Sequence, residues 1–181
     1  MLHIIVPKTE LFLEDTNRFY YIKETHLTLE HSLISLSKWE SKWKKPFLSK
    51  RSLITDEERL DYIRCMTITP NVDPFTYAAL TSENIKAIDD YIDDPQSATV
   101  FSKDKEKGSN RIVTSELIYY WMFSLGIPLE LERWHLNRLL TLIRVFQFEN
   151  QPKKKHKMTR DDLAKRDALN RQRKAKYHTN G

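Results

Sequence analysis

Residues 114–146 read TSELIYYWMFSLGIPLELERWHLNRLLTLIRVF, and this stretch decides the class of fold. Its apolar residues recur at intervals of three and four positions, the spacing that places side chains on one face of an α-helix. Gly126 and Pro128 interrupt the pattern, because glycine favours the end of a helix and proline the start of the next. The stretch therefore predicts two antiparallel helices, at 114–125 and 129–146, that form the centre of the core.

Further helices are predicted upstream of this stretch. Apolar residues at helical spacing begin near Ser32 and continue to the break at Pro46. The sequence TDEE, which starts at Thr55, is typical of a capping box and predicts the start of a second helix. Asp73 directly precedes a proline and Ser82 precedes another apolar stripe, so we expect two short helices capped by these side chains.

The first thirty residues follow a different pattern. Residues 2–6 and the segment FYYIKETHLTL at 19–29 are rich in β-branched and aromatic types, and the turn-forming segment LEDTN at 13–17 lies between them. An N-terminal β-hairpin is therefore expected. The predicted fold class is α+β and mainly α-helical, with the hairpin followed by a compact helical bundle and a basic C-terminal tail.

The charge of the chain changes sharply near residue 150. Residues 151–181 contain eleven Lys or Arg and three Asp, a balance of +8, and since the whole chain carries +5, residues 1–150 carry −3. We expect a globular domain at 1–150 and a basic tail at 151–181 that is flexible or becomes helical on a partner, because its apolar face is thin. The polar stretch 93–110 is expected to be a surface loop with a disordered centre.

The residue types that support catalysis are not arranged for it. The histidines lack the spacing of a helical zinc site, the three glycines are isolated, and no serine has the context of a nucleophile elbow. The single cysteine, Cys65, permits neither an intrachain disulfide nor a thiolate zinc site, and we expect it to be a small buried side chain. His26 and His31, which flank a strand end, are expected to be exposed rather than ligands. The sequence predicts no enzymatic activity, no cofactor and no metal site.

Nothing in the sequence predicts attachment to a membrane. Its apolar runs are all shorter than the ~20 residues that span a bilayer. The N-terminal segment MLHIIVPKTE also lacks a basic region followed by an apolar stretch, the pattern of a secretion signal. We therefore expect the chain to be cytoplasmic.

Two segments are candidate partner-binding sites. In KWESKWKKPF at 38–47, Trp43 and Phe47 stand beside several lysines, a combination typical of the edge of a protein interface. The basic tail suits either phosphate or an acidic protein surface, although its lack of interleaved aromatics argues against stacking on single-stranded bases. The candidate residues in the tail are Lys153, Lys154, Lys155, Arg160, Arg166, Arg171 and Arg173.

Several longer segments carry a family resemblance that spans most of residues 20–181. They are HLTLEHSLISLSKWESKWKKPFL at 26–48, CMTITPNVDP at 65–74, YIDDP at 91–95, TSELIYYWMFSLGIP at 114–128, WHLNRLLTLIRV at 134–145 and ALNRQRKAKYHTNG at 168–181. Together they resemble a family of tailed-bacteriophage and prophage proteins from tail modules, similar to tail assembly chaperones.

The resemblance implies a non-enzymatic helper in the cytoplasm of the infected bacterium that binds the tape measure protein, with tail tube subunits as a second client. A first alternative is a structural tail or neck component, which would be present in purified virions. A second is a nucleic-acid-binding accessory protein that acts through the basic tail, although the acidic charge of residues 1–150 makes nucleic acid the less favoured partner. The oligomeric state is left open, a homo-oligomer included.

Overall fold

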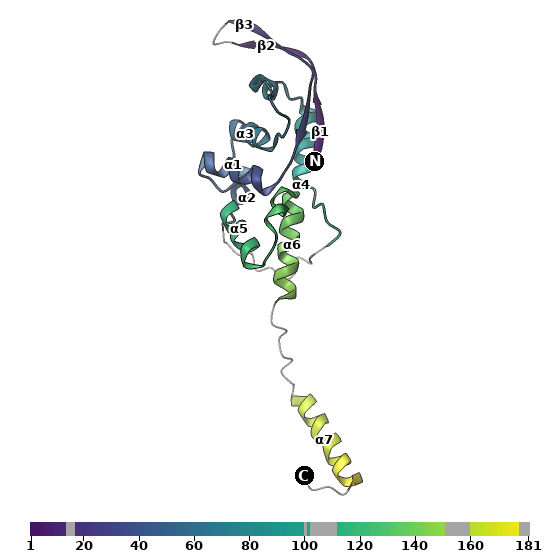
Figure 1. Ribbon diagram of the computed structural model, residues 1–181. Helices are drawn as coiled ribbons and strands as arrows, with labels where there is room; N and C mark the ends of the chain where they lie inside the picture. Colours follow the sequence, from purple (N-terminus) through teal and green to yellow (C-terminus); the bar gives the residue numbers. More distant parts are fainter. Residues whose placement is uncertain (14–16, 100, 102–111, 151–159, 178–181) are drawn as a thin grey trace. The chain divides into compact units, whose positions relative to one another are not determined.

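The structure is a computed structural model, and it describes residues 1–13, 17–99, 101, 112–150 and 160–177. The chain divides into two compact units, Met1–Glu149 and Asn150–Gly181. The first unit combines a β-ribbon with helices, so the predicted mainly helical α+β fold with an N-terminal β element is confirmed (Figure 1). Its elements are β1 (Leu2–Val6), β2 (Thr9–Leu13), β3 (Arg18–Ile22), β4 (Thr25–Leu29), α1 (Leu33–Trp43), α2 (Phe47–Lys50), η1 (Arg51–Leu53), α3 (Asp56–Met66), η2 (Pro74–Ala79), α4 (Ser82–Asp93), α5 (Ser115–Ser124), η4 (Leu129–Arg133) and α6 (Leu136–Glu149).

Strands β1 to β4 form one long antiparallel ribbon that is interrupted once. β1 pairs with β4 and β2 pairs with β3, and the second ladder continues the register of the first. The interruption lies at Pro7, which has no backbone N–H to donate to a ladder. The predicted turn falls largely on residues 14–16, which lie outside the described part of the chain.

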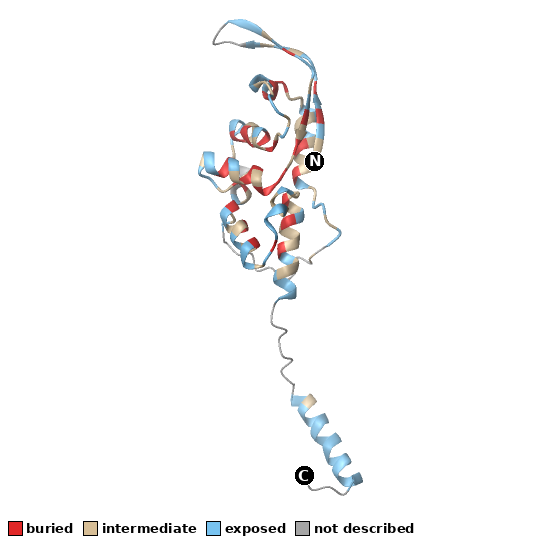
Figure 2. Cartoon of the chain, in the orientation of Figure 1, coloured by how far each residue is buried: buried red, intermediate tan, exposed pale blue. Residues whose placement is uncertain are grey.

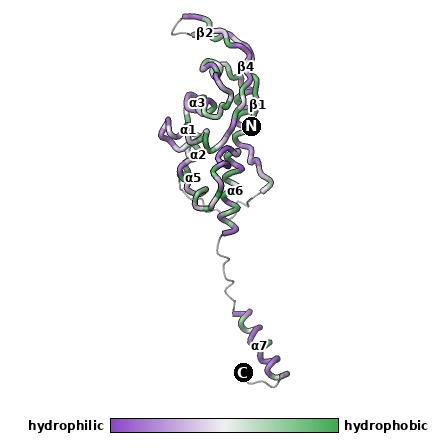
Figure 3. Tube along the Cα trace, in the orientation of Figure 1, coloured by the Kyte–Doolittle hydropathy of each residue, from purple (hydrophilic) through white to green (hydrophobic). Residues whose placement is uncertain are grey.

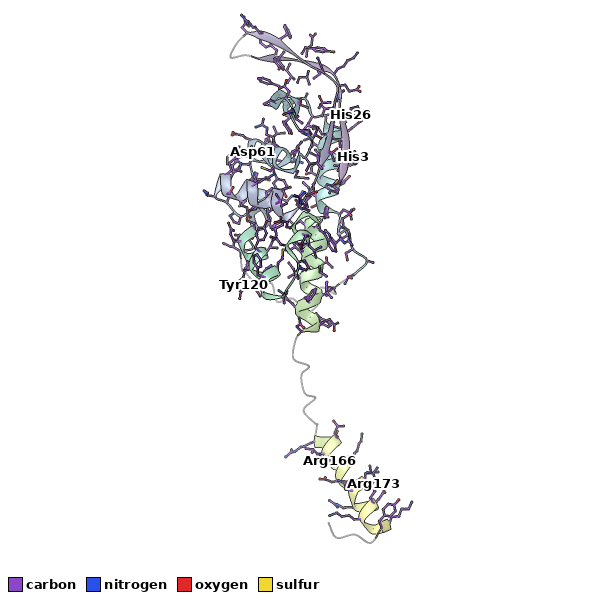
Figure 4. The ribbon with its side chains drawn as sticks, viewed as in Figure 1. His3, His26, Asp61, Tyr120, Arg166 and Arg173 are labelled. Carbon is purple, nitrogen blue, oxygen red and sulfur yellow. The ribbon has the colours of Figure 1, made fainter. Side chains whose placement is uncertain are left out.

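The half of the ribbon formed by β1 and β4 packs against the helices. Its inward side chains, Ile4, Val6 and Leu27, are buried, whereas His3 and Ile5 face outward. Figure 4 labels His3 on this outward side. The alternation is that of an antiparallel ribbon with one face on the core and one face in water.

The other half of the ribbon, β2 and β3, is named the arm here. In Figure 1 it bends over η2. Tyr20 lies on the inward face of the arm, where its ring packs against Phe75 with 4.5 Å between the centroids and its hydroxyl donates a 2.6 Å hydrogen bond to Asp73. The pairing register is continuous through both halves, so each face of the ribbon can be followed along its whole length. The arm packs inward with one face, and β1 and β4 bury the other.

Helix α1 lies at the centre of the core. Helices α2, α3, α5 and η4 pack against it, and its side chains Leu33, Leu36 and Trp39 are completely buried. The indole N–H of Trp39 donates to the backbone carbonyl of Glu58 in α3 at 2.8 Å. The prediction that α5 and α6 form the centre of the core is therefore wrong, although both helices contribute buried side chains to it (Figure 2).

The predicted single helix at 129–146 is also wrong, because two helices occupy this stretch. Leu129–Arg133 is the 3-10 helix η4, Trp134 is extended, and α6 begins at Leu136. The backbone N–H of Leu136 donates to the carbonyl of His31 at 2.8 Å. A hydrogen bond to the junction between β4 and α1 therefore sets the start of α6, and periodicity along the sequence does not reveal such a contact.

Several helix ends follow the predictions. Ser32, Thr55 and Thr114 each accept a hydrogen bond from a backbone N–H three residues further on, and Thr55 is part of a complete capping box. Gly126 follows α5 with a φ of 66°, a left-handed conformation that costs glycine little. Local capping chemistry is thus a reliable guide to where these helices begin and end.

Helix α4 corrects one predicted cap. Its N-cap is Thr81, which forms a reciprocal capping box with Asn84, while Ser82 is the first helical residue. The predicted surface loop at 93–110 begins where α4 ends, but most of it lies outside the described residues. Within the part of the chain that the structure describes, no helix has the length and apolar character needed to cross a bilayer.

Glu40 connects three helices. It lies in the C-terminal half of α1 and is 6% exposed. One carboxylate oxygen accepts from the N–H of Phe47, the first residue of α2, at 3.0 Å, and the other accepts from the N–H of Ser115, the first residue of α5, at 2.7 Å. A carboxylate at a helix N-terminus satisfies backbone donors that have no partner within the helix and complements the helix dipole. One side chain therefore satisfies the first backbone N–H of both helices.

We predict that Glu40→Ala lowers the free energy of unfolding by at least about 2 kcal/mol, since each buried donor left without an acceptor costs about 1–3 kcal/mol. Glu40→Gln should lose less, because its single carbonyl oxygen still accepts one of the two N–H groups. Urea unfolding measures both effects. Glu130→Ala, at an exposed position of η4, is the matched control, and equal stabilities for Glu40→Ala and this control would contradict the assignment.

Candidate partner-binding surfaces

The predicted partner-binding segment at 38–47, named the rim here, has Phe47 folded inward. Phe47 is 2% exposed, stacks on Tyr62 with 3.8 Å between the ring centroids, and meets Trp39 edge-on at 5.1 Å. Its expected role as a partner contact is therefore wrong. The hydrophobic effect places this ring in the core. The chain leaves α1 at Lys44, which has a left-handed φ of 55°, and Pro46 is the N-cap directly before Phe47. Trp43 is half-buried and stacks beside Trp39.

Carboxylates of α3 hold the polar groups of this rim. Asp61 is buried and accepts hydrogen bonds from the indole N–H of Trp43 at 2.7 Å and from the ammonium group of Lys42 at 2.6 Å. Glu58 pairs with Lys45, and this hydrogen bond, together with the backbone N–H of Thr55, holds the pKa of Glu58 below its usual value. These ion pairs tie Lys42 of α1 and Lys45, which follows α1, to α3, while both lysine side chains stay more than half exposed.

His31 is buried, which corrects the prediction that it is exposed. It is 1% exposed, its Nδ1 shares a 2.7 Å hydrogen bond with the hydroxyl of Tyr62, and its ring lies edge-on to His135 at 5.1 Å. Burial, with a smaller contribution from His135, lowers the pKa of His31 to about 3. His26 is exposed, as predicted, and lies 3.7 Å from Glu24.

A pocket of about 550 Å³ lies between η1, α3 and α4. Its floor is apolar and includes Tyr62, while Arg51 and Arg59 both bind Asp89 at its rim. Arg51 also pairs with Asp93. The partly exposed ion pairs join α3 and η1 to α4, and each such pair adds little stability. Among the described residues that line this pocket, the polar groups at its edge are engaged in the ion pairs that join these helices.

A second hollow of about 310 Å³ lies between α2, α5 and α6 and is named the groove here. Ile143 is buried at its base, and Trp121 and Leu140 are half-buried in its walls. Grooves lined mainly by apolar side chains accept the apolar face of an amphipathic helix. The complete lining consists of Leu48, Ser49, Val113, Trp121, Leu140, Ile143, Arg144 and Gln147.

The predicted cationic residues of the tail are partly described. Helix α7 (Arg160–Tyr177) belongs to the second unit, and none of its residues is buried. Arg160, Arg166, Arg171 and Arg173 all lie on α7 and are exposed, and Figure 4 labels two of them. Figure 3 shows that α7 is hydrophilic along most of its length. The other predicted cations, Lys153, Lys154 and Lys155, lie outside the described residues.

The charges of α7 are unevenly distributed along its axis. Its seven Lys or Arg and three Asp leave a net charge of +4. The aspartates lie at 161, 162 and 167, each four residues before a Lys or Arg, a spacing that stabilises a helix. After residue 167 the helix contains only basic charges, which also complement the negative end of the helix dipole. The C-terminal half of α7 therefore presents a cationic surface.

Sequence reasoning missed Glu40 and the groove. The sequence did contain a sign of Glu40's role. This acid occupies a position on the otherwise apolar face of α1. Leu140 gave no such signal, since a half-buried leucine in a groove has the same spacing as one in the core. Only the packing of α2 beside α5 and α6 separates the two cases.

The described residues contain no group of three or more His, Cys, Asp or Glu that could hold a metal ion. Cys65 is half-buried rather than fully buried, and burial raises the pKa of its thiol to about 11. Thiolate chemistry at neutral pH is disfavoured at such a site. Comparison of the chain with protein-family models, with curated proteins and with solved structures found no match.

We predict that acid destabilises the first unit through His31. The unfolded chain binds a proton near the ordinary histidine pKa of 6.5, whereas the folded state does so only near 3. The free energy of unfolding should therefore fall by about 1.4 kcal/mol per pH unit as the pH decreases through this window. Urea unfolding at a series of pH values measures the slope.

His31→Asn retains a polar partner for the hydroxyl of Tyr62 but removes the titrating ring, so its slope should be smaller between pH 6 and about 4. The exposed His26→Asn is the matched control and should keep the wild-type slope. Carboxylates titrate in all three proteins and cancel in the comparison. Identical slopes for the wild type and His31→Asn would refute the assignment.

Proposed function

We propose that this protein is a non-enzymatic tail assembly chaperone of a tailed bacteriophage, which binds the tape measure protein in the host cytoplasm and has tail tube subunits as a second client. The observation that carries the proposal is the groove between α2, α5 and α6. A long helical client presents apolar side chains at intervals of three and four residues, and a groove lined by Trp121, Leu140 and Ile143 suits such a row. The family resemblance of the sequence supports the same role.

Helix α7 supports the proposal as a second contact. It has no buried residue, and the cations of its C-terminal half favour an acidic surface. Three aspartates on the same helix oppose a phosphate backbone, so an acidic protein segment is the better match than nucleic acid. In this proposal the groove binds the apolar face of the client helix and α7 binds acidic residues of the client.

We expect the full-length chain, co-expressed with the tape measure and tail tube proteins of the same phage, to retain the tape measure protein in a pull-down. Leu140→Gln should weaken retention, because it places an amide in the wall of the groove. Leu60→Gln is the matched control, since Leu60 is also half-buried in a helix but does not line the groove. Circular dichroism checks that both variants are folded.

A separate prediction concerns α7. The triple variant Arg171→Gln, Arg173→Gln, Lys174→Gln keeps helix propensity and removes three charges. Retention of the client should fall about tenfold at low salt, since exposed ion pairs contribute about 0.2–1 kcal/mol each. The matched control removes three charges from the first unit with Lys38→Gln, Lys86→Gln and Arg133→Gln, all exposed, and should bind normally.

Two outcomes would replace the proposal. Failure to capture the tape measure protein, together with stoichiometric presence in purified virions, would make this a structural tail or neck component. The other outcome is binding to duplex DNA. The logarithm of the affinity would then fall with the logarithm of the salt concentration, with a slope of about −0.9 for each phosphate contacted. If the α7 variant abolished this binding, the protein would be a nucleic-acid-binding protein.

A further inference from the structure

Three consecutive residues attach the start of α6 to the rest of the first unit. The N–H of Leu136 donates to the carbonyl of His31, and Nε2 of His135 lies 2.9 Å from the backbone carbonyl oxygen of Tyr91 in α4. The side-chain amide of Asn137 donates to two further backbone carbonyls at the end of α4, each at 2.8 Å. These contacts join α6 to α4 and to the junction between β4 and α1. Together they are named the latch here.

Two imidazole rings lie against each other within the latch. The rings of His31 and His135 meet edge-on, with 5.1 Å between their centroids. His31 is fully buried against Tyr62, while His135 is half-buried and lies edge-on to Tyr91 at 4.9 Å. Burial disfavours the charged form of an imidazole, and a second positive charge at this distance disfavours it further. The closed latch therefore favours two neutral rings.

The hydrogen bond of His135 determines which neutral form the latch accepts. A carbonyl oxygen can only accept, so Nε2 carries the hydrogen that points to Tyr91. Nδ1 is then an acceptor, and this buried atom has no hydrogen-bond partner among the residues that the structure describes. A proton on Nδ1 would be a buried donor that no described group accepts, which is costly. Protonation of His135 therefore opposes the closed latch.

The charged groups around the two rings do not offset this cost. Burial, His135 and the guanidinium of Arg51 lower the pKa of His31 to about 3. Burial also lowers the pKa of His135, the N-terminal ammonium group adds to this effect, and the carbonyl of Tyr91 and the carboxylate of Asp94 oppose it. Burial raises the pKa of the two neighbouring hydroxyls above the ordinary value of 10, so both stay neutral. These hydroxyls belong to Tyr62 and Tyr91.

Helix α6 can separate without unfolding the elements before it. It is the last helix of the first unit, and Leu136, Leu139 and Ile143 are its only fully buried side chains. Helices α1 and α3 are joined to each other by contacts that do not involve the latch, such as the hydrogen bond from Trp39 to Glu58. Segments with few buried apolar contacts open locally at a lower free energy than the core.

We propose that the latch is an acid-sensitive joint, in which protonation of His31 and His135 releases the start of α6 from α4 and from the junction between β4 and α1 while the core around α1 stays folded. Leu140 and Ile143 lie on α6, so opening of the latch removes one wall of the groove. The inference does not depend on the proposed chaperone function, because the latch opens or stays closed without a client.

The direction of the effect follows from the two states of His31. In the open latch the ring has the ordinary histidine pKa of 6.5, whereas in the closed latch its pKa is about 3. The closed latch is therefore fully stabilised above pH 6.5 and loses this stabilisation as the pH falls toward 3. The ratio of open to closed latch should rise about thirtyfold between about pH 7.5 and about pH 5 from His31 alone.

Native-state hydrogen exchange of the full chain, followed residue by residue with NMR, tests the inference. The amides of Leu136 and Leu139 donate to the carbonyls of His31 and His135 and report on the latch, while the amide of Leu36 in α1 reports on the core. At about pH 5 the protection factors of the two latch amides should be about thirtyfold lower or more. Their exchange should not respond to low urea, because a local opening exposes little surface, whereas that of Leu36 should rise with urea.

Two substitutions identify the titrating groups. His135→Gln keeps a donor toward Tyr91 without titrating, and together with His31→Asn it should abolish the additional loss of latch protection in acid. The exposed His26→Gln is the matched control and should keep the wild-type response. Equal urea dependence of the latch amides and Leu36 in the wild type at about pH 5 would overturn the inference, since α6 would then open only with the core. An undiminished acid response in the double variant would also overturn it.

Discussion

The buried carboxylate of Glu40 is the interaction on which the helical part of the first unit depends most. It joins α1 to the first residues of α2 and α5, and the second of these lies 75 positions away in the sequence. Burying a carboxylate is costly unless its oxygens accept hydrogen bonds, and here two helix N-termini supply the donors. Leu48 and Trp121, which line the groove from α2 and α5, are positioned by this contact. Two walls of the groove therefore depend on one polar contact.

The junction between β4 and α1 positions the third wall of the groove. The backbone carbonyl of His31 accepts a hydrogen bond from the N–H of Leu136, the first residue of α6. The imidazole ring of His31 shares a hydrogen bond with the hydroxyl of Tyr62 in α3. The N-cap of α1, Ser32, follows directly. Two consecutive residues at the end of the ribbon thus fix where α1 and α6 begin. Polar contacts between elements define the groove, and apolar burial supplies most of the stability around them.

The features that could be predicted from the sequence are those that local chemistry determines. The capping residue Thr55, the left-handed Gly126 and the alternation in the first strand each depend on a few neighbouring positions. The features that were missed depend on contacts between distant segments. Phe47 is buried because Tyr62 and Trp39 receive its ring, and the start of α6 depends on His31. No spacing along the chain carries this information, and an apolar stripe does not reveal whether it faces the core or a groove.

The arm also has a consequence for solubility. A short segment of high β-propensity and low charge that is apolar on both faces has the composition of sequences that stack into open-ended cross-β assemblies. The base of the arm, where it joins β1 and β4, limits this risk, since Pro7 and Lys8 precede β2 and Lys23 and Glu24 follow β3. Charged and proline residues beside an apolar strand act as gatekeepers against edge-to-edge growth. The chain can therefore keep an apolar ribbon on its surface while these flanking residues oppose growth along the strand edges.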